Sequence, residues 1–589
     1  MNRLAIISGT LPSSVEHEAS PASRSRRQFI GKMGGVAAAA ATVGAIGLSP
    51  LLDSAATKAE AATRPVPEGG GSRVAKCYQL RVEAAARDAK VQVPPHTTNG
   101  DEKRYADKSG SFTKGLLQDS YGRVNLNAYQ SMKTAFASGN PADFEQMIMG
   151  GTHTMNNPQG ALAFDMEGCD SVQFGNAPSA ANQEGVAVVP PPPAVATAAY
   201  GTELVELYWG SLLRDVAFTD YASNATAVAA AAELSSMPYY AGPRNSSGQV
   251  TPDLLFRGGY PGETVGPYIS QLFITPTAFG QQPISQQMKT YLPNIDYMTD
   301  LTTWFQVQNG IDTGLRNQVD SQLRYQRNGR DLSAWTHADV LYQGYFIGFL
   351  VLNTLGVPLN PGNPYVGSKT QNGFCTFGGP EIAASLGELA ARSLDRSWYQ
   401  KWVVHLRHRP ESGGGILQLI QTGQGSSIDA KLNRNVLNSR AVAASFSKYG
   451  SYLLSQAFPE GSPTHPAYPT GHGVVAGACI TLLKFFFDGN HLIANPVVPT
   501  NDGLSLEPYT GSDAGQITVN GELNKLAHNV TFGHGIHPGI HWRSDSDASM
   551  VLGEAFAISV LQDKAACYNE KFTVSFTKLD GTTATISNE

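Results

Sequence analysis

Two cations stand near the end of a predicted helix in the segment WYQKWVVHLRHRPE. Lys401 and Arg409 are eight residues apart, slightly more than two turns at about 3.6 residues per turn, so both can project from one helix face. Paired cations bind an oxyanion through charge-assisted hydrogen bonds. Pro410 is predicted to end this helix. The alternative is an exposed face that carries two solvated cations.

A second anion-binding feature is predicted at the start of a helix. The segment SPTHPAYPTGHGVVAGAC places a Pro-Thr-Gly-His turn directly before an apolar helix that begins near Gly473. Free N–H groups at a helix start favour anions, Gly471 lets the backbone come close, and the hydroxyl of Thr470 adds a donor. His472 follows this turn and, taken alone, is as consistent with a structural histidine as with a catalytic one.

A third segment, GHGIHPGIHWRSDSD, concentrates histidines. His534, His537 and His541 are followed by Asp545. A metal cluster is the competing interpretation, but His537 and His541, which have the helical i, i+4 spacing, are interrupted by Pro538. The three segments together favour ligation of an anion over chelation of a metal cation.

The composition predicts a large globular protein with a small partner. The 589 residues are 41% hydrophobic and 15% charged, so the chain can bury a large core. The formal net charge of -6 and the pI near 6.1 show no basic excess. This argues against nucleic acid as a partner, and any anion site must be built from local residues.

Helices must position the three segments. Apolar residues at spacings of three and four predict helices over Glu203–Arg214, Ile295–Val307, Trp335–Leu355, Glu381–His405, Gly473–Phe487 and Ala548–Gln562. Strand-like alternation is found mainly at Phe572–Ile586, where a small hairpin is expected. The predicted fold is therefore mainly α, built from helical bundles with long loops and little β structure.

The N-terminus has the pattern of a twin-arginine export signal. Arg26 and Arg27 precede a soft Ala/Gly/Val segment. That segment is shorter than the roughly 20 residues that span a bilayer, so no stable membrane insertion is expected. Small residues before Ala62 predict cleavage there, in a periplasmic or secreted protein. We expect a signal peptide over 1–61, an extended arm over 62–115 and a helical domain over 116–589, with its catalytic core at about 375–565.

Taken in order, these motifs resemble the vanadium-dependent haloperoxidases, which share their core with type 2 phosphatidic acid phosphatases and bacterial acid phosphatases. The family pattern is a Lys and an Arg-Pro, a Pro-Ser-Gly-His turn, and a downstream His. Longer stretches such as LFRGGYPGETVGPYISQLF and NGFCTFGGPEIAASLGELAAR resemble the algal and cyanobacterial bromoperoxidase branch. The resemblance covers roughly residues 115–565.

The resemblance implies an enzyme that uses vanadate and hydrogen peroxide to oxidise bromide or iodide to hypohalous acid, which halogenates small organic acceptors. It implies that His541 is the single nitrogen ligand of vanadium and that His472 is the acid–base group. Lys401 would also polarise bound peroxide, and His465 matches the extra histidine of bromoperoxidases. The cofactor oxygens would be held by Lys401, Arg409, Thr470, Gly471 and His472. A homo-oligomer is also implied.

Two positions depart from the family pattern. Thr470 stands where the family usually has Ser, which preserves the hydroxyl. The family arginine six residues before the ligand histidine is replaced here by Gly535, beside an apparent one-residue insertion, so His534 or His537 would have to substitute for it. Two alternatives remain open: a phosphatase in which His541 attacks phosphorus, and a non-catalytic anion-binding protein.

Overall fold

The computed structural model describes residues 70–88, 96–151 and 189–588. By its internal contacts the chain divides into Met1–Gln79 and Leu80–Glu589, and the fold below is that of the second unit. The predicted signal peptide and its cleavage position lie outside the described residues. In the predicted extended arm, Gly70–Asp88 instead forms helix α3. Four alanines and three arginines favour a helix in this stretch.

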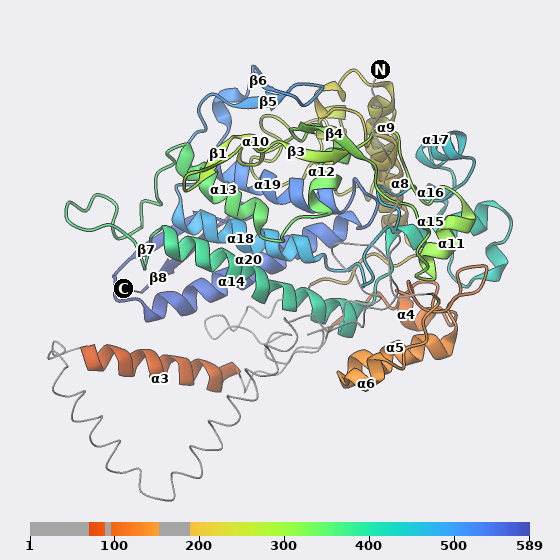
Figure 1. Cartoon of the computed structure of the whole chain (residues 1–589), viewed down its shortest axis with the longest axis horizontal. Helices are drawn as coiled ribbons and strands as arrows, with labels where there is room; N and C mark the ends of the chain where they lie inside the picture. The colour runs from red at the N-terminus through yellow and green to blue at the C-terminus, as the bar shows by residue number, and fades with distance from the viewer. Residues whose placement is uncertain (1–69, 89–95, 152–188, 589) are drawn as a thin grey trace, which may run out of the picture. The chain divides into compact units, whose positions relative to one another are not determined.

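The core of the second unit is built around helix α18 (Gly471–Phe486), which is buried at every position. It packs against α14 (Gly379–Tyr399), α19 (Val519–His534) and α20 (Arg543–Cys567). Figure 1 shows α14, α18 and α20 running side by side, with α19 next to them. A helix that is apolar on all sides requires such cover, so the residues that start α18 lie deep in the protein.

Smaller helices surround this core. The other α-helices of the described residues are α4 (Asp101–Arg104), α5 (Leu126–Ser138), α6 (Pro141–Phe144), α8 (Ala198–Leu212), α9 (Ala225–Ser235), α10 (Gln271–Ile274), α11 (Leu301–Gln308), α12 (Gly329–Thr336), α13 (Gln343–Thr354), α15 (Pro410–Gln421), α16 (Arg434–Leu437) and α17 (Arg440–Tyr449). Single turns are formed by η1 (Phe218–Asp220), η2 (Pro252–Leu254), η3 (Gln400–His405), η4 (Gly425–Ser427) and η5 (Ala514–Gln516). The predicted mainly α fold is confirmed.

The β structure consists of two-stranded antiparallel pairs. They are β1 (Thr277–Phe279) with β2 (Gln282–Ile284), β3 (Met288–Tyr291) with β4 (Val319–Arg324), β5 (Val497–Pro499) with β6 (Leu506–Pro508), and β7 (Thr573–Thr577) with β8 (Thr583–Ser587). The last pair is the hairpin predicted near the C-terminus. Its buried pair Val574 and Ile586 faces the core, as the alternating pattern requires.

The bounds of the predicted helices differ from those in the structure, and two of them show why. The helix expected from Ile295 begins only at Leu301, because the carboxylate of Asp300 caps it by accepting the N–H of Thr303. The helix expected over Trp335–Leu355 is broken between α12 and α13. The break carries Asp339 into the interior, next to the start of α18. No helix among the described residues is long and apolar enough to cross a membrane.

Candidate active site

Lys401 and Arg409 lie in the same region, as predicted, but they do not project from one face of a single helix. Lys401 lies in η3, a π-helical turn that follows α14, and the chain then leaves the helix at Leu406, which has a left-handed φ of 47°. Arg409 is the N-cap of α15, so Pro410 begins a helix rather than ending one. Proline is well suited to the first helical position because the N–H it lacks would have no partner there.

Arg409 contacts two of the predicted site histidines, His465 and His541. Its side chain is fully buried, and its Nη1 donates to Nε2 of His541 at 2.7 Å and to the carbonyl of Ile540 at 2.9 Å. Its Nη2 lies 2.9 Å from Nδ1 of His465, and its Nε donates to the carbonyl of His465. The guanidinium therefore joins the loop before α18 to the loop before α20.

Lys401 anchors the same loop from the other side. The side chain is fully buried, and its Nζ donates to the carbonyls of Pro466 at 2.6 Å and Ala467 at 3.2 Å. The ammonium also lies 5.6 Å from the ring centre of Trp398. Lys401 and Arg409 both act electrostatically on His465 and His541. The predicted pair of cations thus converges on one region.

The start of α18 faces this region with unused hydrogen-bonding capacity. Thr470 is the N-cap residue, and its N–H donates to Oγ of Ser549 at 2.7 Å. Its own hydroxyl, Oγ1, is buried and has no hydrogen-bond partner among the described residues. The first N–H groups of a sixteen-residue helix, beginning with Gly471, add a partial positive charge here. A hydroxyl and a helix N-terminus together suit an oxyanion.

His472 is held from both sides. Its Nε2 lies 3.0 and 3.2 Å from the two carboxylate oxygens of Asp339, whose side chain is fully buried. Its ring stacks on that of His534, with 3.7 Å between centroids and an interplanar angle of 23°. Asp339 lies 133 residues away from His472 and belongs to no motif, so the sequence did not predict this contact. The carboxylate of Asp339 fixes the orientation of the His472 ring, which suits an acid–base group.

His541 is oriented by Asp545, one turn further along the chain. Nδ1 of His541 lies 3.0 Å from Oδ2 of Asp545, which also accepts the N–H of Trp542. Arg407 in turn donates to Asp545 at 2.6 Å and to Glu203 at 2.9 Å. Donation from Nδ1 to the carboxylate leaves the lone pair of His541 on Nε2, the nitrogen that faces Arg409.

Burial keeps His541 and His465 neutral. It is the main cause that lowers the pKa of His541 well below its usual value, and Arg409 and Lys401 lower it further. The pKa of His465 falls for the same reasons, with Lys401 acting more strongly than Arg409. Neutral imidazoles keep their lone pairs, so His541 is able to ligate, while the lysine and arginine supply the positive charge that an anion requires.

Of the two candidates for the missing arginine, His534 faces the site and His537 does not. The ring centroid of His534 lies 5.4 Å from that of His541, and its buried Nδ1 has no hydrogen-bond partner among the described residues. His537 points away, its Nε2 lying 3.0 Å from the hydroxyl of Tyr268. His534, at the end of α19, therefore lies beside His541.

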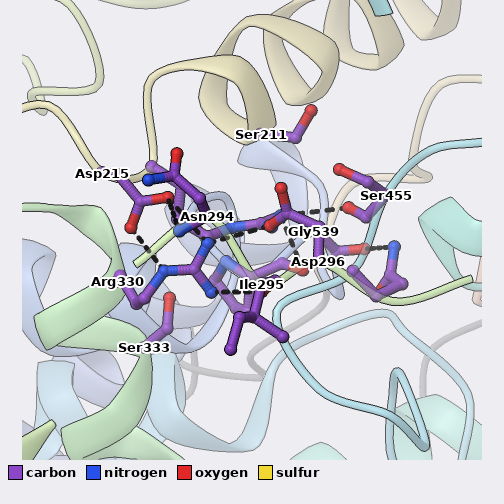
Figure 2. Close-up of polar contacts among 12 residues, drawn as sticks. Ser211, Asp215, Asn294, Ile295, Asp296, Arg330, Ser333, Ser455 and Gly539 are labelled. Atoms are coloured by element: carbon purple, nitrogen blue, oxygen red, sulfur yellow. Dashed lines mark hydrogen bonds and ion pairs between the residues drawn. The ribbon is translucent and has the colours of Figure 1, made fainter. Parts of the chain in front are cut away.

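A buried ionic network holds the turn between α19 and α20 in place. Arg214 donates to the carbonyls of His537 at 2.7 Å and Ser455 at 3.0 Å and pairs with Asp296. Arg330 pairs with the same carboxylate at 2.9 Å, as Figure 2 shows. Burial alone would raise the pKa of Asp296, but the two arginines hold it well below its usual range. The network fixes the backbone that leads to His541.

These groups combine the features that a tetrahedral oxyanion bound through one nitrogen requires. The residues that fit such an ion are Lys401, Arg409, Thr470, Gly471, His472, His534 and His541, and they combine fixed positive charge with an unpartnered hydroxyl and one imidazole lone pair. Among the described residues, no group of three His, Cys, Asp or Glu side chains is arranged to hold a metal cation. The fold and the site together define a helical enzyme of oxyanion chemistry.

Comparison with known proteins agrees. No protein-family model matches the chain. The vanadium-dependent bromoperoxidase of Ascophyllum nodosum is 32% identical over 538 residues, 87% of this chain and 92% of the relative. That of Corallina officinalis is 30% identical over 605 residues, 87% of this chain and 98% of the relative. The homohexameric structure of the second vanadate-dependent bromoperoxidase from A. nodosum superposes with a TM-score of 0.77 and 27% identity, covering 89% of this chain and 94% of that one.

The chain therefore belongs to the family of vanadium-dependent bromoperoxidases. This confirms the predicted family, the predicted haloperoxidase class of enzyme and vanadate as the cofactor. The contacts described above place the predicted site residues together, while the chemical role of each remains a prediction.

Proposed function

We propose that this protein oxidises bromide or iodide with hydrogen peroxide to hypohalous acid, which then halogenates small organic acceptors. The observation that carries the proposal is the environment of Nε2 of His541. This atom holds a lone pair fixed by Asp545 and faces the guanidinium of Arg409. An imidazole ligand beside buried cations is what a bound oxyanion of vanadium requires.

In the proposed site His541 is the nitrogen ligand, and Lys401, Arg409, Thr470 and the N–H of Gly471 hold the oxygens. When bound, vanadate supplies Lewis-acid activation of hydrogen peroxide without a change in its own redox state. Arg409 donates to Nε2 of His541 in the structure, so the guanidinium must turn its donors toward the oxyanion before that nitrogen can ligate. Lys401 contributes a positive charge that favours electron withdrawal from peroxide oxygen.

His472 moves the proton. The reaction consumes hydrogen peroxide, halide and one proton and yields hypohalous acid and water. In our proposal the imidazole of His472 takes a proton from the approaching peroxide and returns it to the oxygen that leaves as water. The carboxylate of Asp339, 3.0 Å from Nε2, stabilises the imidazolium that forms in between.

His465 is proposed to tune the halide. Its ring lies 4.8 Å from that of Trp398, and its Nδ1 lies 2.9 Å from Arg409. A neutral histidine in contact with the guanidinium draws one of its donors away from the oxyanion and so affects the charge available at the site. We expect bromide and iodide to be oxidised well and chloride poorly.

Export and assembly complete the proposal. The twin-arginine motif at Arg26 and Arg27 supports transport of the folded protein to the periplasm or outside the cell. The solved bromoperoxidase from A. nodosum is described as a homohexamer. We propose that this chain also works as a homo-oligomer.

The test is a bromination assay with a phenolic dye and purified protein, with and without added vanadate. We expect vanadate to restore bromide oxidation after the cofactor has been stripped, and His541→Ala to abolish it. Halide oxidation that is indifferent to vanadate would overturn the proposal. Phosphomonoester hydrolysis by the stripped protein, lost in His541→Ala, would establish the phosphatase alternative instead.

A further inference from the structure

A cavity lies at the C-terminal end of α18, the end opposite His472. Its volume is about 280 Å³, far more than the roughly 15 Å³ that a single water requires. The walls come from the last turn of α18, residues 488–490, the start of α19 and strand β7. None of the residues that hold the proposed cofactor lines it, so its ligand chemistry is a separate question.

Lys484 lines this cavity and lacks a hydrogen-bond acceptor. Its residue exposure is 1%, and its Nζ makes no hydrogen bond within the described residues. Burial lowers the pKa of this ammonium to about 8, against the opposing effect of Glu554, Glu263 and Asp580. A buried ammonium without an acceptor is strongly disfavoured. The cavity beside it is the available place for the missing acceptor.

A residue of the same cavity wall carries an acceptor without a donor. Oδ1 of Asn520 is buried and has no partner in the described part of the chain. By contrast, the neighbouring Asn360 uses its amide to donate to the carbonyls of Lys484 at 3.4 Å and Ser575 at 3.0 Å, which braces the wall. Two residues of the cavity wall therefore each carry a buried polar atom without a partner, one a donor and one an acceptor.

The surrounding charge selects against an anion. Asp488 is part of the cavity wall, and none of the three carboxylates that act on Lys484 accepts a hydrogen bond from its Nζ among the described residues. These carboxylates thus partly balance the positive charge of Lys484, but its Nζ still lacks a hydrogen-bond acceptor. A neutral oxygen can accept this hydrogen bond without bringing a second negative charge close to Asp488. A hydroxyl group can also donate a hydrogen bond to Oδ1 of Asn520.

We propose that this cavity binds a small neutral polyhydroxylated molecule, such as a sugar or a sugar alcohol, with hydroxyl groups that accept from Lys484 and donate to Asn520. Phe576 supplies an apolar surface in the same wall, against which the C–H face of such a molecule can pack. A few convergent polar groups beside an apolar surface are typical of small-molecule sites.

The experiment is ligand-observed saturation-transfer NMR on the full-length protein with mannitol and glucose as neutral probes and acetate and lactate as anionic probes. We expect at least one neutral probe to bind to the parent, and Lys484→Met to weaken it by about tenfold or more, because a charge-assisted hydrogen bond is lost. The matched control is Lys369→Met, which removes an exposed lysine and should leave binding unchanged.

Asn520→Ala is the second variant, because it tests the acceptor without changing the charge in the cavity. It should weaken the neutral probe while circular dichroism shows an unchanged fold. The proposal is overturned by any of three results: no probe binds, binding is equal in the parent and Lys484→Met, or an anionic probe binds more tightly than the neutral ones in a manner that depends on Lys484. Bromide oxidation does not enter this test, so its outcome is independent of the proposed activity.

Discussion

Replacing His534 by alanine tests whether this residue takes the place of the family arginine. His534 and His537 are three residues apart and both buried, and burial is the main cause that lowers the pKa of each, that of His537 to about 3. Of the two, only His534 faces His541, the proposed ligand. His537→Ala is therefore a matched control that removes an equally buried imidazole from the same turn.

The expected magnitude follows from the hydrogen bond that is lost. If His534 donates to the oxyanion as an imidazolium, its removal costs about 1.5 to 3 kcal/mol, or about 10- to 150-fold in vanadate affinity. In the absence of an anion His534 is neutral, because burial and then the nearby His472 and His541 lower its pKa well below the usual value. A bound anion raises that pKa, so binding takes up a proton. The affinity of the parent should increase as the pH falls from about 8 to about 5.

The assay is isothermal titration calorimetry with vanadate at several pH values across this range. His534→Ala should bind more weakly and with a shallower pH dependence than the parent, and the slope that remains reports the protonation of vanadate and of other groups. His537→Ala should keep both the affinity and the slope, although loss of its bond to Tyr268 lowers its Tm. Equal losses in the two variants, or an unchanged His534→Ala, would refute the reasoning.

Three further outcomes are expected. Asp545→Asn should weaken vanadate binding by about 10- to 100-fold in the same calorimetry, because the ligand imidazole loses its orienting carboxylate; full affinity would contradict this role. Asp339→Asn should lower kcat for bromide oxidation by about 10- to 100-fold at unchanged vanadate affinity, and an unchanged kcat would exclude a proton role. Burial disfavours the protonated form of His528, but Glu263 and Asp547 raise its pKa to about 9. The stabilising effect of this positive charge is therefore complete below about pH 6.5 and is lost as the pH rises through 9. His528→Gln should thus lower Tm more at pH 6 than at pH 10, and an equal loss at both values would contradict this.

The parts of the site that could be predicted from sequence are those carried by short local motifs. The Pro-Thr-Gly-His turn was placed correctly at the start of a buried helix, because an apolar run behind a turn leaves few other structures. The geometry assigned to Lys401 and Arg409 was wrong even though the two cations do meet. Helical periodicity could not reveal that the chain leaves the helix at Leu406 and enters a new one at Pro410.

Contacts between distant segments could not be predicted. Asp339 reaches His472 only because the expected helix over Trp335–Leu355 breaks, and a lone aspartate in a polar stretch carries no signal of its partner. Glu203 likewise lies in a helix whose pattern predicted burial but not a link to Arg407. The choice between His534 and His537 required the direction of each ring, which depends on how one inserted residue is accommodated.

The guanidinium beside His541 also governs which metals the site admits. A buried imidazole lone pair is a ligand that zinc or copper would ordinarily take. Here any divalent cation would approach two fixed positive charges, Lys401 and Arg409, at a nitrogen to which one of them already donates. The two cationic side chains repel common metal ions, which are positively charged. They attract a metal that is bound to oxygen in an anion. Selectivity for vanadium in this protein is thus selectivity for an oxidised, anionic form of a metal over bare ions.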